Sequence, residues 1–154
     1  MKYQETIKDF EKNYDERKTK TLKAMQKYYL KTDLLKNNNV IYEVFIKKLS
    51  PINLALTVIN PGSVDKEYYM TSGHIHLKKT PEFYILLDGK GILLVQKDKL
   101  KIVNLKKGEI AFIPEGYAHR LINNGKQKLK VLTIYHEDSR PNYNIKFNKR
   151  FFKK

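Results

Sequence analysis

From Val40 onward, short runs rich in Val, Ile, Leu, Tyr and Phe alternate with turn sequences that contain Gly, Asn or Pro. Runs of this kind favour the extended backbone, and Gly, Asn and Pro supply the special angles of turns. Many short strands at such spacing indicate an all-β sandwich or barrel. The predicted strands cover residues 40–48, 54–59, 82–87, 92–96, 101–105, 109–113, 120–122 and 129–135.

Residues 1–38 differ from this pattern, because they contain neither Gly nor Pro and are densely charged. We expect a helical segment here. Leu22, Met25 and Tyr29 follow the i, i+3, i+7 spacing of one helix face, and we expect that face to pack on the barrel. Asp33 is a candidate cap for a further short turn.

One domain of 154 residues can bury a core without disulfides. Within it we expect the helical segment at 1–38, the barrel at 40–138 and a basic tail at 139–154. The tail is rich in Lys, and we expect it to be weakly ordered beyond Tyr143.

The composition limits the chemistry of any site. There is no Cys, so a metal must be held by imidazole, carboxylate or backbone oxygen. No apolar run reaches the ~20 residues of a membrane span, and the first residues lack the apolar core of a secretory signal, which predicts a cytoplasmic protein. The net charge of +15 comes from basic residues spread along the chain rather than grouped in one arm. This spread argues against nucleic acid as a partner, while the charge suits a small anionic substrate.

Only four histidines occur, and their spacing is informative. In a strand, residues i and i+2 point to one face, so His74 and His76 can present both rings to one point. Glu82 follows a turn at 77–81, and His119 follows the turn at 114–116. Three imidazoles and one carboxylate would form a plausible shell for a divalent metal, although each His alone is more often a surface or core residue.

The second histidine region resembles a motif of the cupin superfamily, G-x5-PxG-x2-H-x3-N, at Gly108, Pro114, Gly116, His119 and Asn123. The first cupin motif, G-x5-HxH-x3-4-E-x6-G, is matched at its two histidines, its Glu and its last Gly. It departs in two places, since five residues precede Glu82 and position 68 is Tyr. The resemblance implies a double-stranded β-helix, that is, a cupin jelly-roll barrel.

A narrower resemblance joins residues 54–62, 68–76, 88–91, 117–120 and 134–135 to the cupin-type glucose-6-phosphate isomerases of archaea, over roughly residues 18–143. It implies one divalent metal ion per subunit, Fe²⁺ ahead of Mn²⁺, Ni²⁺ or Zn²⁺, a sugar phosphate as substrate, and a homodimer. The implied metal ligands are His74, His76, Glu82 and His119, the implied phosphate-binding residues are Thr57, Thr71 and Gly73, and the implied catalytic residues are Glu82 and Tyr84.

This resemblance leaves several points open. Glu82 would shuttle a proton between two sugar carbons, with a metal-assisted hydride shift as the rival route. Where the family has a histidine, this chain has Pro141, while Tyr143 is retained and His136 lies five residues earlier. The alternative functions are an iron-dependent dioxygenase, which would consume oxygen, and a non-catalytic cupin that binds sugars or nucleic acid.

Overall fold

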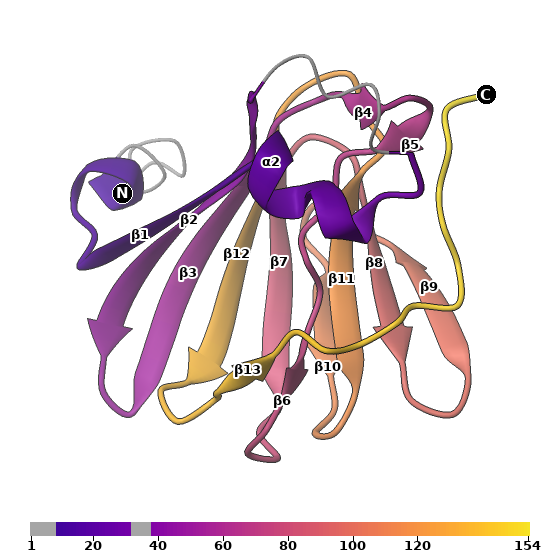
Figure 1. Cartoon of the computed structure of the whole chain (residues 1–154). Coiled ribbons are helices and arrows are strands. Elements are labelled where there is room, and N and C mark those ends of the chain that lie inside the picture. The colour runs from indigo at the N-terminus through magenta and orange to yellow at the C-terminus, as the bar shows by residue number, and fades with distance from the viewer. Residues whose placement is uncertain (1–8, 32–37) are drawn as a thin grey trace.

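Two antiparallel sheets make up most of the structure, which is a computed structural model describing residues 9–31 and 38–154. The larger sheet runs in the order β1-β2-β3-β12-β7-β10, and the smaller in the order β11-β8-β9 (Figure 1). In the larger sheet the strands are β1 (Glu16–Thr21), β2 (Val40–Leu49), β3 (Ile52–Ile59), β12 (Leu129–His136), β7 (Glu82–Asp88) and β10 (Ile110–Ile113). In the smaller sheet they are β11 (Ala118–Asn123), β8 (Gly91–Gln96) and β9 (Leu100–Asn104). All eight predicted strands are found, within two residues at each end, and the all-β barrel is confirmed.

Four shorter strands complete the barrel. They are β4 (Ser63–Val64), which pairs with β5 (Glu67–Tyr68), and β6 (Ile75–His76), which pairs with β13 (Pro141–Asn142). Upstream of β6 the chain runs antiparallel to β11, through bridges from Met70 to Ile122 and from His74 to His119. This segment therefore extends the smaller sheet and places the HxH sequence beside β11.

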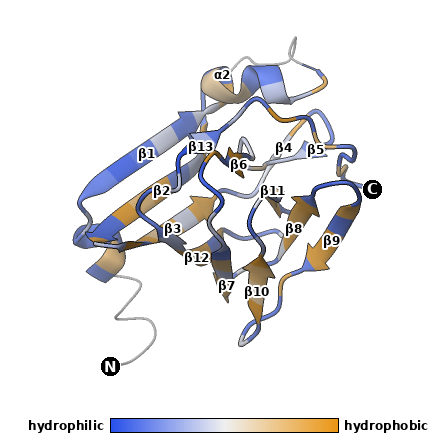
Figure 2. Ribbon diagram, turned by 90° about the horizontal axis from the view of Figure 1, so that it is seen from below, coloured by the Kyte–Doolittle hydropathy of each residue, from blue (hydrophilic) through white to orange (hydrophobic). Residues whose placement is uncertain are grey.

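The core lies between the sheets. Leu129 and Val131 on β12 and Leu93 and Leu94 on β8 are completely buried there. Along β12 the buried positions alternate with half-buried ones, as expected for a strand with one face on the core. Figure 2 shows β8 and β10 as hydrophobic strands and β1 as a hydrophilic one.

The N-terminal helical segment is smaller than expected. Helix is found at residues 9–12, in α2 (Leu22–Met25) and in the 3-10 turn η1 (Gln26–Tyr28). The prediction of helix over Glu16–Thr21 is wrong, because these residues form β1 and pair with β2. The expected packing of Leu22, Met25 and Tyr29 is confirmed, since all three are buried in the core. The turn predicted at Asp33 lies outside the described residues.

The basic tail crosses the barrel rather than leaving it (Figure 1). After β13, Phe147 and Phe151 pack against the core cluster, and the N–H of Lys153 donates to the Lys66 carbonyl over 2.8 Å. The tail beyond Tyr143 is thus part of the packed structure, contrary to the expectation of weak order. None of the helical segments in the described ranges has the length and apolar character that a membrane crossing requires.

Candidate metal centre and substrate pocket

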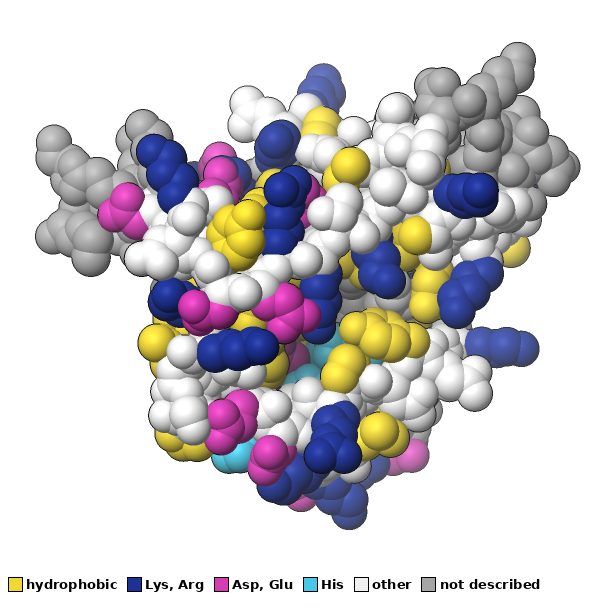
Figure 3. Space-filling model, turned by 60° about the vertical axis from the view of Figure 1, so that its left-hand side comes forward, with side chains coloured by type: hydrophobic (Ala, Val, Ile, Leu, Met, Phe, Trp, Pro, Cys, Tyr) yellow, Lys and Arg dark blue, Asp and Glu magenta, His cyan; other side chains and the backbone are white. Residues whose placement is uncertain are grey.

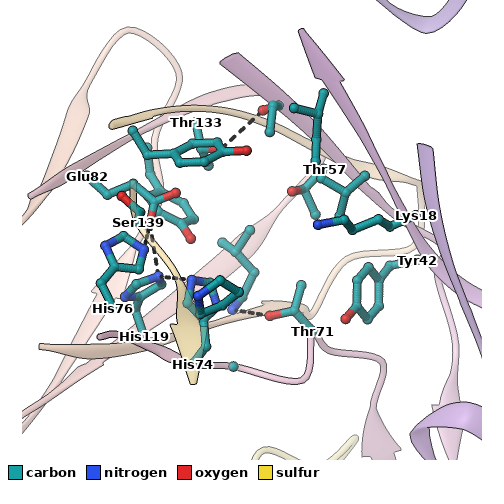
Figure 4. A pocket seen from close by; sticks show the side chains of 18 of the residues that line it. Lys18, Tyr42, Thr57, Thr71, His74, His76, Glu82, His119, Thr133 and Ser139 are labelled. Carbon is teal, nitrogen blue, oxygen red and sulfur yellow. Dashed lines mark hydrogen bonds and ion pairs between the residues drawn. The ribbon is translucent and has the colours of Figure 1, made fainter. Parts of the chain in front are cut away.

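Four side chains with metal-binding atoms converge between the two sheets (Figure 4). One ligand atom from each of His74, His76, Glu82 and His119 lies within 4.8 Å of the others. His119 belongs to β11, His76 to β6, and Glu82 is the first residue of β7 in the larger sheet. Residues 77–81 reverse the chain between β6 and β7. The longer spacing before Glu82 therefore does not prevent the convergence.

Hydrogen bonds on the far sides of the rings orient two of the imidazoles. His119 Nδ1 lies 3.2 Å from the Tyr117 carbonyl, and His76 Nδ1 lies 3.2 Å from the Thr80 carbonyl. A carbonyl only accepts, so in both rings Nδ1 carries a hydrogen, and the neutral form of each ring presents the lone pair of Nε2 to the cluster. Such contacts to the second nitrogen are the usual support of a metal-binding His.

The lone pairs face a carboxylate. Glu82 Oε2 lies 3.0 Å from His119 Nε2 and 3.3 Å from His76 Nε2, and His74 Nε2 lies 3.1 Å from His119 Nε2. Despite these distances, Glu82 Oε2 has no well-aligned hydrogen-bond donor among the described residues. Electron-rich atoms this close, in a buried place, repel one another unless a cation is shared between them. The donor set therefore fits a divalent metal ion.

The ionisation of Glu82 and His74 agrees with that fit, while at His76 burial is outweighed by the Glu82 carboxylate, which raises the pKa of that ring. Burial acts to raise the pKa of Glu82, but the neighbouring imidazoles outweigh it and lower the pKa to about 2. Burial, together with His119, lowers the pKa of His74 to about 3. At neutral pH the site thus holds an anionic carboxylate and a neutral His74 ring, which are the forms that bind metals.

A cavity of about 150 Å³ opens onto this cluster. In the space-filling view, His side chains show at the bottom of a hollow bordered by hydrophobic and charged side chains (Figure 3). The residues that line the cavity come from β1, β2, β3, β6, β7, β11 and β12, from the segment before β6, and from the start of the tail. The cavity can therefore hold a small molecule that touches both the cluster and the opposite wall.

All the residues predicted to bind phosphate line this cavity. Thr57 lies on β3 and is buried, and Thr71 and Gly73 lie in the segment that runs along β11. The N–H of Leu121 donates to Thr71 Oγ1 over 3.1 Å, which leaves the hydroxyl hydrogen of Thr71 able to donate elsewhere. The structure brings these residues together in the wall; their contact with phosphate remains a prediction.

Gly73 is required by its backbone and by its neighbours. Its φ of +71° lies in the left-handed region, which favours Gly. A Cβ at this position would lie 2.6 Å from Phe147 Cε2 and 2.9 Å from Arg120 Nε. The Arg120 guanidinium lies 4.3 Å from the Phe147 ring centre and donates to the Ser72 carbonyl over 2.8 Å. Arg120 and Phe147 thus support the backbone of residues 71–73, which form this part of the cavity wall.

Tyr84, which the resemblance implies to be catalytic, lies beside the metal-type cluster. Its ring centre is 5.7 Å from that of His119, and its side chain lines the cavity. Burial, with Glu82 nearby, raises the pKa of Tyr84 well above its usual value. The hydroxyl is therefore protonated at neutral pH and can donate a hydrogen bond.

Of the two remaining candidate site residues, Tyr143 lines the cavity and His136 is not among the described lining residues. Tyr143 lines the cavity, with its ring centre 5.6 Å from that of His74, and Pro141 pairs with His76 across β13 and β6. His136 is at the end of β12, is half exposed, and is absent from the described cavity lining. His136 thus does not take the place of the family's histidine in this structure.

Several residues of the cavity wall were not predicted from the sequence: Lys18, Tyr42, Thr133, Tyr135 and Ser139. For Thr133 and Tyr135 a signal existed. On β12 they follow Leu129 and Val131 at every second position, so all four side chains point to the same face of the sheet. Polar side chains at the last two of these positions interrupt an apolar series. For Lys18 no local signal existed, because its position depends on the pairing of β1.

Comparison with known proteins agrees with the geometry. The family model described as glucose-6-phosphate isomerase (GPI) matches residues 2–150. The glucose-6-phosphate isomerase of Thermococcus litoralis is 32% identical, over 99% of this chain and 90% of its own length. Those of Thermococcus onnurineus and Pyrococcus horikoshii are 35% and 36% identical, over 79% and 74% of this chain; the match spans 68% and 64% of their own lengths.

Solved structures agree on the fold. A cupin-2 domain from Rhodospirillum rubrum aligns with a TM-score of 0.54 at 12% identity, over 66% of this chain and 64% of its own. An oxalate decarboxylase from Lactobacillus farciminis aligns with a TM-score of 0.54 at 22% identity, over 62% of this chain and 29% of its own. At such identities these likenesses show the cupin barrel alone.

Proposed function

Because this chain belongs to the glucose-6-phosphate isomerase family, we propose that it interconverts glucose 6-phosphate and fructose 6-phosphate with one divalent metal ion per subunit. The observation that carries this proposal is the buried cluster of three imidazoles and one carboxylate at one end of a cavity. Hydroxyl groups and a Gly line the same cavity. A sugar phosphate needs both: the metal-type cluster for its sugar oxygens and hydrogen-bond donors for its phosphate.

The proposed metal ligands are His74, His76, Glu82 and His119. Imidazole and carboxylate donors suit first-row metals, and four protein ligands leave room in an octahedral shell, which favours Fe²⁺, with Mn²⁺, Ni²⁺ or Zn²⁺ as alternatives. A cation held there would act as a Lewis acid that stabilises negative charge developing on the sugar oxygens.

Glu82 is the proposed proton carrier. The isomerisation removes a proton from one of two adjacent sugar carbons and returns a proton to the other, so it requires a base in its anionic form. The lowered pKa of Glu82 supports that form at neutral pH. Tyr84 donates a hydrogen bond that positions the open-chain sugar, which its raised pKa supports.

The phosphate is proposed to bind at Thr57, Thr71 and Gly73. Thr hydroxyls and an unencumbered backbone N–H are good donors to phosphate oxygens. Figure 4 draws Thr57 across the cavity from the imidazoles, so that a sugar bound between them would have its phosphate far from its reacting carbons.

Removal of the metal tests this function. After chelation, conversion of fructose 6-phosphate is expected to fall to background, because the charge that develops in the reaction loses its main stabilisation. Separate addition of Fe²⁺, Mn²⁺, Ni²⁺ or Zn²⁺ should restore it, with Fe²⁺ giving the highest rate. Full activity in a protein shown to be free of metal would refute the proposal. Oxygen uptake without isomerisation would instead indicate the alternative function, an iron-dependent dioxygenase.

We further propose a homodimer formed through the outer face of the larger sheet. Phe83 on β7 and Phe112 on β10 are exposed there, with ring centres 5.3 Å apart, and Ile110 beside them is 63% exposed. A cluster of exposed apolar side chains next to an edge strand favours association. Light scattering should find a dimer that Phe112→Glu converts to a monomer, whereas Ile102→Glu on β9 should leave it unchanged. A monomeric unsubstituted protein would contradict this.

A further inference from the structure

One basic side chain reaches into the cavity from the edge of the larger sheet. Lys18 on β1 is the only Lys or Arg among the described residues that line the cavity. Figure 4 draws it on the side of Thr57, Tyr42 and Thr71, across from the imidazoles. The cavity therefore has a cation at the end opposite the candidate metal centre.

The strand pairing explains this direction. Lys18 lies opposite Val44 in the antiparallel pairing of β1 with β2, and directly paired residues share a face of the sheet. Val44 lines the cavity, so the Lys18 side chain extends from the same face. Without β1 in this register, the lysine would not reach the cavity.

The ammonium of Lys18 is available to a ligand. Among the residues that the structure describes, it pairs with the carboxylate of Glu16, 3.3 Å away, and the two side chains are 47% and 39% exposed. An ion pair this exposed to solvent contributes little and is readily exchanged. The proposed phosphate donors Thr57, Thr71 and Gly73 are all neutral, so they supply hydrogen bonds but no positive charge for a phosphate dianion. Lys binds phosphate as a point charge.

We propose that Lys18 binds the phosphate of the substrate and gives the site its preference for phosphorylated over free sugars. This inference rests on the proposed function for the identity of the sugar. The residue acts on binding and lies across the cavity from the proposed metal ligands. It should therefore affect KM rather than kcat.

The test compares Lys18→Met with Lys18→Arg and with Lys101→Met in the metal-loaded protein. Lys101 lies on β9 in the other sheet and is exposed, so its replacement removes the same charge far from the cavity. In Lys18→Met the KM for fructose 6-phosphate is expected to rise about tenfold, the scale of one charge-assisted hydrogen bond at a partly exposed site. The kcat and the metal content should stay unchanged. Lys18→Arg should restore most of the binding.

A second measurement does not depend on catalysis. Calorimetry with inorganic phosphate should show about tenfold weaker binding to Lys18→Met, and raised salt should weaken binding to the unsubstituted protein more than binding to this variant. Unchanged KM and phosphate affinity in Lys18→Met would overturn the role of Lys18, while isomerase activity of the unsubstituted protein would still support the proposed function. If that protein binds phosphate through Lys18 but does not isomerise the sugar, the proposed function fails and the phosphate site stands.

Discussion

Replacing His119 with Ala is expected to remove nearly all bound metal and to lower kcat at least about 100-fold, since the loss of a group that merely supports a ligand already costs 10–100-fold. His119 is 2% exposed, and its Nε2 faces both Glu82 and His74. Its removal therefore takes a donor from the centre of the cluster. Metal analysis of the purified variant and fructose 6-phosphate turnover measure the two effects.

His136→Ala is the matched control for His119→Ala. The same residue type is replaced, but His136 is half exposed at the end of β12 and is absent from the described cavity lining. Its metal content and turnover should match those of the unsubstituted protein. Thermal unfolding of each protein after chelation separates a folding defect from loss of the metal. A His119→Ala protein that is metal-free and fully active would refute the proposed ligand set.

Glu82→Gln is expected to lower kcat by about 10²- to 10⁴-fold, the usual contribution of a general base. The amide keeps the size of the side chain and one oxygen that can bind a metal, but it cannot accept the proton at neutral pH. Activity should be expressed per bound metal ion, because this change also weakens the site. Glu109→Gln makes the same replacement at an exposed position and should have no effect.

Isotope transfer distinguishes the proton carrier from the hydride route. Glucose 6-phosphate with deuterium at C2 is converted in ordinary water, and the product is analysed by mass spectrometry. A proton carried by Glu82 should exchange in part with solvent before it returns to the sugar, so that part of the label is lost. Complete retention of deuterium at C1 would exclude the role of Glu82 as proton carrier, even if Glu82→Gln were inactive through loss of metal.

The barrel strands could be predicted because their signals are local. The apolar run 92–96 follows Gly91, and the run 129–135 comes shortly after the turn sequence at 123–125; these runs match β8 and β12. The strand β1 could not be predicted in this way, because Arg17, Lys18 and Lys20 interrupt any apolar alternation. It forms an edge strand whose backbone pairs with β2, so tertiary pairing overrides its local preference.

The site residues also divide into those with a local sequence signal and those placed only by tertiary pairing. The four metal-type residues could be predicted, since strand geometry places His74 and His76 on one face and the cupin motifs point to Glu82 and His119. Lys18 could not be predicted, because it reaches the cavity only through β1, and a helix was expected there. Similarly, Phe147 supports Gly73 from the tail, and nothing in the tail's Lys-rich sequence indicates that contact.

The donors of the candidate metal centre come from both sheets, and this bears on when a metal ion could bind. The cluster joins His74 and His76 to Glu82 and to His119, and His119 is held by β11, which follows His74 by more than forty positions. Contacts between such distant parts of a chain form late, after the entropy of closing the intervening loop has been overcome. A chain still emerging from the ribosome would therefore lack the complete set of donors, and uptake of a metal ion there would mark the end of folding rather than guide its beginning.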